Sequence, residues 1–218
     1  MTRIKAGIIG AAGYTAGELI RILLNHPQVE LLFAQSSSHS GEPVTSVHDD
    51  LLGETGLSFS TSPDLQKADV LFLCQGHGKS REFIGTNPLP EGIKLIDLST
   101  DFRIRDDSHA FVYGLPELNR DMIRRADRVA NPGCFATGIQ LAFLPMASAG
   151  CLTSDLHVQA ITGSTGAGQQ STATTHFSHR ESNLSAYKIF EHQHQEEILQ
   201  SIGHLQPGFA HRLNFIPI

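Results

Sequence analysis

The feature that most constrains this chain is a glycine turn between a short apolar run and a helical pattern. Residues 4–9 are mostly apolar, residues 10–13 read Gly-Ala-Ala-Gly, and apolar side chains then recur at helical spacing from residue 18 to residue 24. Pro27 ends this helix, and residues 29–34 resemble a second strand. Strand, glycine turn, helix and strand form a βαβ unit, from which parallel, doubly wound sheets are built.

The same alternation of strand and helix patterns continues to about residue 147. Apolar runs at 70–74, 93–96 and 129–130 each end in a polar or glycine-rich loop, and the last leads into a helix expected over 135–144 and ended by Pro145. Beyond it, residues 156–161 and 213–216 are strand candidates and 196–202 a helix candidate. We predict an α/β fold, with a Rossmann-type doubly wound parallel sheet over residues 1–147 and an α+β domain over residues 148–218.

Composition excludes several classes of function. The chain has 218 residues, 40% of them hydrophobic, and a formal net charge of −6, which does not suit non-specific binding of nucleic acid. Its apolar stretches are too short to span a membrane, and its N-terminal residues do not read as a targeting signal. Three cysteines without a CxxC pair suit a reducing compartment, so we expect a cytoplasmic protein.

The glycine turn predicts a dinucleotide site. Glycines after a first strand permit a tight turn and close approach of a pyrophosphate to the following helix, so Gly10, Ala12, Gly13, Tyr14 and Thr15 are candidate cofactor contacts. The alternative is a glycine turn that binds nothing.

Two further segments bear on the cofactor. The second strand ends in Ser36, Ser37 and Ser38 where an acidic residue would bind the ribose of NAD, so NADP is favoured, although these serines could simply cap a loop. The segment from Gly76 to Ser80 ends in Gly-Lys-Ser but lacks the first glycine of a P-loop. We expect its backbone, with Gly76, to lie near the cofactor.

Cys134 is the candidate nucleophile. It follows Pro132 and Gly133 at the expected start of a helix, where unsatisfied N–H groups and the helix dipole favour negative charge on sulfur. The alternative is a buried structural cysteine, the role that we assign to Cys74 and Cys151.

Other candidates are polar residues with competing explanations. His192 and His194 would share one face of a strand; a metal site lacks further ligands at suitable spacing, so an acid/base near Glu196 and Glu197 is preferred, with a solvated surface run as the alternative. Arg103 could hold an anionic substrate or form a surface ion pair.

Six blocks occur in the order found in a known family. They are residues 10–19 (Gly-Ala-Ala-Gly-Tyr-Thr-Ala-Gly-Glu-Leu), 97–103 (Asp-Leu-Ser-Thr-Asp-Phe-Arg), 113–117 (Tyr-Gly-Leu-Pro-Glu), 131–138 (Asn-Pro-Gly-Cys-Phe-Ala-Thr-Gly), 163–168 (Gly-Ser-Thr-Gly-Ala-Gly) and 192–198. With these blocks the chain resembles the N-acetyl-γ-glutamyl-phosphate reductases of the aspartate-semialdehyde dehydrogenase-like group.

The resemblance implies an NADPH-dependent reduction of an N-acyl-γ-glutamyl phosphate to the semialdehyde in arginine biosynthesis, through a thioester on Cys134. It assigns acid/base catalysis to His192, with Glu197 orienting it. It also implies a second domain for catalysis and dimerisation, and we expect a homodimer or homotetramer. We expect Ser164 and Gly166 to contact cofactor, and the substrate to be held by Arg103, Asn131, Ser164, Thr165, Gly166 and Gln169.

The chain departs from the family pattern at three places. Gln169 stands where a basic residue is usual, Gln75 and Gly76 replace Leu-Pro, and family members continue beyond Ile218, so the second domain is expected to be incomplete here. Other readings are a sister dehydrogenase acting on aspartyl or acyl-aminoadipyl phosphate, and a non-catalytic NADP-binding module. The choice between N-acetyl and N-succinyl substrates stays open.

Overall fold

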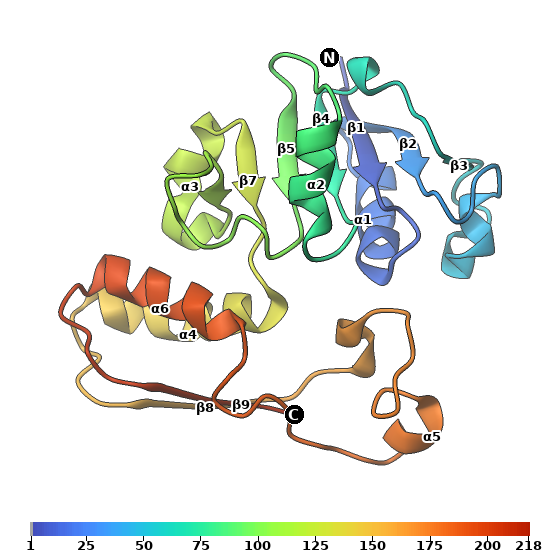
Figure 1. Cartoon of the computed structure of the whole chain (residues 1–218). Helices are drawn as coiled ribbons and strands as arrows, with labels where there is room; N and C mark the ends of the chain where they lie inside the picture. The colour runs from blue at the N-terminus through green and yellow to red at the C-terminus, as the bar shows by residue number, and fades with distance from the viewer. Residues whose placement is uncertain (1) are drawn as a thin grey trace. The chain divides into compact units, whose positions relative to one another are not determined.

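A computed structural model describes residues 2–218 (Figure 1). The chain folds as two compact units. The first contains residues 1–114 and 121–131, and the second contains residues 115–120 and 132–218. Among the described residues, no helix is long and apolar enough to cross a membrane.

The first unit is built on a seven-stranded sheet in which every strand pairing is parallel. The strand order is β3-β2-β1-β4-β5-β7-β6, so the order reverses between β1 and β4. The strands are β1 (Ile4–Ile9), β2 (Val29–Gln35), β3 (Phe59–Ser60), β4 (Val70–Leu73), β5 (Lys94–Asp97), β6 (Val112–Tyr113) and β7 (Arg128–Ala130). The predicted doubly wound parallel sheet is confirmed.

Both faces of the sheet are covered because alternate residues of one strand enter different apolar clusters. Ile8 packs with Ile20 of helix α1 (Tyr14–Leu24), whereas its neighbour Ile9 belongs to the cluster that includes Phe83 of α2 (Lys79–Thr86). Such two-sided burial is typical of parallel sheets, which need helices on both faces. Three single-turn 3-10 segments complete the connections: η1 (Val44–Ser46), η2 (Asp49–Leu51) and η3 (Leu65–Lys67).

Helix α3 (Pro116–Arg125) is interrupted at Asn119, which has non-helical φ and ψ angles. The division between the units falls directly after this kink, with residues 115–120 assigned to the second unit and residues from 121 to the first.

The second unit combines two long helices with a small sheet. Helix α4 (Cys134–Ser148) packs against α6 (His194–Leu205), and β8 (Leu156–Ala160) pairs in parallel with β9 (Leu213–Pro217). Between β8 and α6 the chain forms η4 (Ser164–Ala167) and the four-residue helix α5 (Phe177–Arg180), seen in orange in Figure 1.

Two boundaries differ from the predictions. Helix α4 continues through Pro145 to Ser148, whereas we expected it to stop at Pro145. We also placed the first domain's end at residue 147, but the first unit ends at Asn131, because α4 packs on α6 of the second unit.

Candidate active site

The glycine turn after β1 is shaped by close backbone approach. Gly10 has a φ of +81°, and a Cβ atom there would lie 2.7 Å from the backbone nitrogen of Gln75, which follows β4. The N–H groups of Gly10 and Ala11 both donate to the carbonyl of Gln35, at 3.1 and 2.7 Å. Only glycine meets both the positive φ and the lack of space.

The turn lies at the edge where ligands bind in doubly wound sheets. It joins β1 to α1, next to the reversal of strand order between β1 and β4. Ala12 and Gly13 are half-buried, and Tyr14 and Thr15 open α1 as exposed residues. The first turn of α1 thus presents its positive end without a neighbouring carboxylate in residues 14–17, which suits an anionic ligand.

The end of β2 supplies hydroxyl groups. Ser36 is buried, and its Oγ lies 3.2 Å from Oγ of Ser38, while Ser37 and Ser38 are exposed. Gln35 is the last residue of β2, so the strand ends without a carboxylate to repel a 2′-phosphate. These residues fit NADP.

The loop after β4 is organised by a carboxylate that sequence reasoning missed. Gly76 is exposed with a φ of +95°. The Asp101 carboxylate accepts from the N–H groups of Gly78 at 2.6 Å and Arg81 at 3.0 Å, and so caps α2. An anion at this helix start would meet the Asp101 charge, so the N-terminus of α2 is a poor phosphate site.

Cys134 is the first residue of α4, and its side chain is exposed. Gly133 is the N-cap, and its carbonyl accepts the first helical bond from Thr137 N at 2.8 Å. In contrast, burial raises the pKa of the Cys74 thiol to about 12. Cys151 is exposed beyond the other end of α4. Cys134 therefore combines access with a helix N-terminus, as predicted.

Helix α6 supplies the residues that hold the peptide before Cys134. Oε2 of Glu197, which is 2% exposed, accepts from the N–H of Gly133 at 2.9 Å. The His194 ring packs on the same glycine, because a Cβ at Gly133 would lie 2.2 Å from His194 Nε2. His194 Nε2 is also 3.9 Å from Glu197 Oε1.

The expectation that His192 and His194 share one face of a strand is wrong. Gln193 has αR angles, and α6 begins at His194. Glu197 therefore lies one helical turn after His194, and this geometry pairs its carboxylate with His194 and Gly133 rather than with His192.

His192 is buried next to the cysteine's helix. Its Nδ1 accepts from the N–H of His194 at 3.2 Å, so the neutral imidazole carries its proton on Nε2. Burial, together with the Lys188 charge, lowers the pKa of His192, which keeps the ring neutral near pH 7. The ring meets Phe135, the neighbour of Cys134, edge to face with centroids 5.6 Å apart.

Tyr187 is a further site residue that the sequence did not single out. Its ring centroid is 5.9 Å from that of His192. Burial raises the pKa of Tyr187, and the electrostatic influence of the nearby Cys134 acts in the same direction, so its hydroxyl keeps its proton and remains a hydrogen-bond donor. Tyr187 lies outside the six family blocks, and no spacing rule identifies it.

Arg103 binds the backbone. It is 6% exposed, and its Nε donates to the Asn131 carbonyl at 2.9 Å while Nη2 donates to that of Leu98 at 3.0 Å. Asn131 is itself exposed, and its N–H donates to Asp97 O at 2.7 Å. Arg103 thus brings together the loops after β5 and β7, at the carboxyl edge of the sheet where we expected it to hold an anionic substrate.

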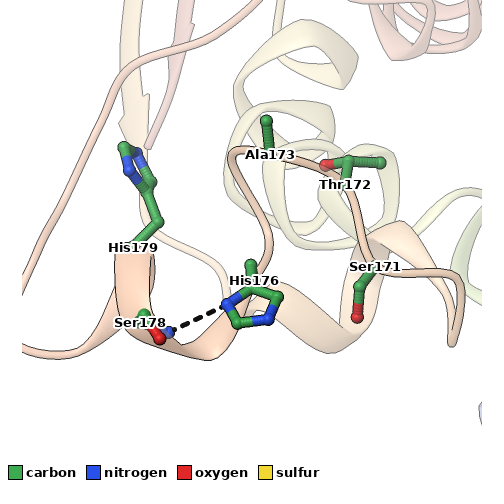
Figure 2. Close-up of a pocket in the computed structure, with 6 residues that line it drawn as sticks. All are labelled: Ser171, Thr172, Ala173, His176, Ser178 and His179. Atoms are coloured by element: carbon green, nitrogen blue, oxygen red, sulfur yellow. Dashed lines mark hydrogen bonds between the residues drawn. The ribbon is translucent and has the colours of Figure 1, made fainter.

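The remaining predicted residues lie in an exposed loop. Ser164, Thr165 and Gly166 belong to η4, and Gln169 follows it. Farther along this loop a polar pocket of about 490 Å³ opens to solvent; Figure 2 shows its lining, in which His176 Nδ1 accepts from Ser178 N at 3.3 Å. The pocket is lined by Ser171, Thr172, Ala173, His176, Ser178 and His179, and contains none of the predicted residues. Within residues 2–218 no cluster of His, Cys, Asp or Glu is suited to a metal ion.

Comparison with known proteins places the two parts of the chain in one family. Residues 5–126 match the family described as semialdehyde dehydrogenase, NAD binding domain, and residues 134–218 match its dimerisation domain. These matches confirm the predicted nicotinamide-cofactor domain and the domain type that follows it, and they indicate a protein that self-associates.

Curated relatives are similar over nearly the whole chain. N-acetyl-gamma-glutamyl-phosphate reductases of Parabacteroides distasonis and Christiangramia forsetii are each 56% identical, over 99% and 98% of this chain. The chain spans about two thirds of their length, 67% and 66%.

Solved structures share the fold. Aspartate semialdehyde dehydrogenase II of Vibrio cholerae, complexed with ASA, superposes with a TM-score of 0.75 at 15% identity, over 100% of this chain and 71% of that one. The Candida albicans enzyme with NADP gives 0.63 at 12% identity, over 100% and 68%.

Proposed function

Because this chain belongs to the N-acetyl-γ-glutamyl-phosphate reductase family, we propose that it reduces an N-acyl-γ-glutamyl phosphate to the N-acyl-glutamate 5-semialdehyde and phosphate, as a step of arginine biosynthesis. The observation that carries the proposal is the exposed Cys134 at the start of α4, which follows a peptide held by Glu197 and precedes Phe135, on which the buried neutral ring of His192 packs.

The sulfur of Cys134 is the nucleophile. It attacks the γ-acyl carbon, the bond from that carbon to the phosphate oxygen breaks, and phosphate leaves from a thioester. Bound NADPH supplies a hydride to a carbonyl carbon. When the carbon–sulfur bond then breaks, the aldehyde is released and the sulfur recovers the electron pair, which regenerates the Cys134 thiolate. The one proton consumed per turnover ends on the released phosphate.

His192 acts on the oxygen of the thiohemiacetal. With Nδ1 occupied by the His194 N–H, its Nε2–H is the group directed to a ligand, and it donates a hydrogen bond to the oxygen that becomes negative. Tyr187, whose hydroxyl stays protonated, is a second donor next to the same ring.

Glu197 acts as a positioning residue. It fixes the Gly133 peptide, and with it the direction in which Cys134 leaves the N-cap of α4. This differs from the role of orienting His192 that the resemblance implied.

The cofactor is NADPH, held by the glycine turn with Ser36, Ser37 and Ser38 at the 2′-phosphate. The positive φ of Gly10, the carboxylate-free first turn of α1 and the hydroxyl-bearing end of β2 support this choice. We assign Ser164 and Gly166 to cofactor, and Ser164, Thr165, Gly166 and Gln169 to the substrate's phosphate or carboxylate, because this exposed loop offers hydroxyls, an amide and backbone N–H groups.

Arg103 and Asn131 then contribute to substrate binding from the ends of β5 and β7. The guanidinium orients the Asn131 carbonyl, and the exposed Asn131 side chain is the group offered to substrate. We further propose a homodimer or homotetramer, since the second unit matches a dimerisation domain. A reducing, cytoplasmic location suits the free thiols of Cys74, Cys134 and Cys151.

The test is phosphate-dependent reduction of NADP measured with three aldehydes. N-acetyl-glutamate semialdehyde should be the best substrate, N-succinyl-glutamate semialdehyde distinguishes the acyl group, and aspartate semialdehyde tests the sister activity. Omission of phosphate should abolish NADP reduction. Turnover of aspartate semialdehyde alone would reassign the substrate, and failure with all three, in a protein that still binds NADPH, would favour a non-catalytic module.

A further inference from the structure

His48 is a buried histidine remote in sequence from both the glycine turn and Cys134. It is 6% exposed and sits between η1 and η2, where its own N–H donates to Val44 O at 3.0 Å and its carbonyl accepts from Leu51 N at 3.1 Å. Its ring packs 6.3 Å from the Phe59 ring, centroid to centroid. The backbone on both sides and this aromatic contact fix the direction of the imidazole.

The ring of His48 contacts the glycine turn. Nε2 lies 2.8 Å from the carbonyl oxygen of Ala11. A carbonyl oxygen can only accept, so Nε2 is the nitrogen that carries the proton and donates. On its other side, Nδ1 is 2.6 Å from the position of a Cβ at Gly17, so the ring fills the space left by that glycine in α1.

The contact has a geometric consequence for the turn. In a planar trans peptide the C=O and the N–H point in opposite directions, and the described chain contains only trans peptides. With the Ala11 carbonyl held by His48, the N–H of Ala12 is directed away from that ring. The N–H of Ala11 is tied at the same time to Gln35 O at 2.7 Å. These two hydrogen bonds together fix the orientation of the peptide groups on both sides of Ala11.

We infer that His48 is a positioning residue for the dinucleotide: through its bond to Ala11 it holds the glycine turn in the conformation that receives the pyrophosphate. The inference rests on the proposed function, since it requires that the turn bind NADPH. His48 touches the turn from the protein interior and has no part in the chemistry at Cys134. Loss of its donor should therefore weaken cofactor binding and leave the thiol unaffected.

The test compares two substitutions in the whole chain. His48→Leu removes the donor, while His48→Gln keeps an N–H donor that can reach Ala11. The dissociation constant of NADPH, measured by fluorescence titration without substrate, should rise about tenfold in His48→Leu, the scale of one lost hydrogen bond, and stay within about threefold in His48→Gln. His26→Gln, at an exposed histidine after α1, is the matched control and should change nothing.

Gly17→Ala provides a second way to disturb the contact between His48 and the glycine turn, without substituting the histidine. The added Cβ would displace the His48 ring, so it should weaken NADPH binding by a similar factor. In the double variant the two effects should be far less than additive, because both break the same contact. The single variant Gly17→Ala keeps the inference testable should His48→Leu not fold.

Two readouts separate this role from general destabilisation and from the proposed function. The rate of Cys134 alkylation by iodoacetamide should be equal in wild type, His48→Leu and His48→Gln. Equal NADPH affinity in folded His48→Leu and wild type would overturn the positioning role while the proposed function stood. Failure of the wild-type protein to bind NADPH at all would overturn both.

Discussion

Cys134 differs from the other two cysteines in combining exposure with a helix start. Cys74 is held neutral by burial, which raises its pKa to about 12, and Cys151 is exposed but beyond the far end of α4. Only Cys134 therefore meets both requirements of a covalent nucleophile, access to substrate and stabilisation of negative charge.

Replacing Cys134 with serine should lower kcat by about 10³-fold or more, because an alcohol does not form the reducible thioester. Cys151→Ser, which also changes an exposed sulfur to oxygen, should keep wild-type kcat. Steady-state NADPH oxidation measures both variants. Substantial activity in Cys134→Ser would exclude covalent catalysis by this residue.

The lowered pKa of His192 predicts an acidic limb in the dependence of kcat on pH. Because its pKa lies below the usual 6.5, the ring is neutral at pH 7, and activity should fall as pH drops through the lowered pKa. Protonation would place hydrogen on Nδ1, which now accepts the His194 N–H. His192→Asn should lower kcat by about 10²–10⁴-fold and abolish this limb.

His194→Asn is the matched comparison, because His194 packs on Gly133 and so affects chiefly the shape of the site. That variant should keep the acidic limb and lose less kcat. A profile in which His194→Asn removes the limb and His192→Asn retains it would exchange the two roles.

At the scale of elements, the glycine before α4 and a glycine inside it differ in the space that each leaves for a side chain. Gly133 precedes the helix with φ −66° and ψ 154°, angles that alanine adopts readily, so it is space and not backbone conformation that excludes a side chain there, and the three nearest atoms belong to the His194 ring. Gly138, in the middle of α4, has no described atom within 4 Å of an added Cβ outside the helix's own backbone.

Gly133→Ala should destabilise the protein by about 1–3 kcal/mol through overpacking, and should lower kcat by displacing the Cys134 peptide. Gly138→Ala should stabilise by up to about 1 kcal/mol through helix propensity. Chemical denaturation measures both changes. In a His194→Ala background the loss of stability caused by Gly133→Ala should largely disappear. An unchanged loss of stability would show that the added Cβ clashes with a group other than the His194 ring.

Sequence patterns identified the regular elements better than the irregular ones. The apolar runs at β1, β2, β4 and β5 have the expected parallel arrangement, because strands buried on both faces leave a strong signal. Helix α4 passes Pro145 although proline lacks the N–H for the bond to residue 141, so a proline in a helical pattern does not by itself mark the end of a helix.

The candidate site was predictable only in part. Cys134 and the glycine turn carry local signals. The roles of Glu197 and Arg103 depend on tertiary partners, Gly133 and the carbonyls of Leu98 and Asn131, that spacing does not reveal. His48 and Tyr187 lie in segments without a motif, so only packing identifies them.

At the scale of the whole molecule, the proposed cofactor turn and the proposed nucleophile belong to different units. Gly10 and Ser37 belong to the first unit, whereas Cys134, His192 and Glu197 all belong to the second. Binding of NADPH and reactivity of the thiol should therefore respond to separate substitutions.

Ser37→Asp should weaken NADPH binding by placing a negative charge near the proposed 2′-phosphate site, and should leave iodoacetamide alkylation of Cys134 unchanged. Cys134→Ser should show the reverse, a normal NADPH dissociation constant without alkylation at residue 134. Wild type should favour NADPH over NADH in kcat/KM. Equal use of the two cofactors, unaffected by Ser37→Asp, would contradict the role assigned to the end of β2.

The contact between Gly133 and the His194 ring also constrains how sequences of this kind can diverge. The ring occupies the volume that a side chain at position 133 would need. A larger residue at 133 is therefore tolerated only after position 194 has become smaller, and the intermediate with both groups present is the unstable one. Across diverged relatives the two positions should covary, with histidine at 194 restricted to sequences that have glycine at 133.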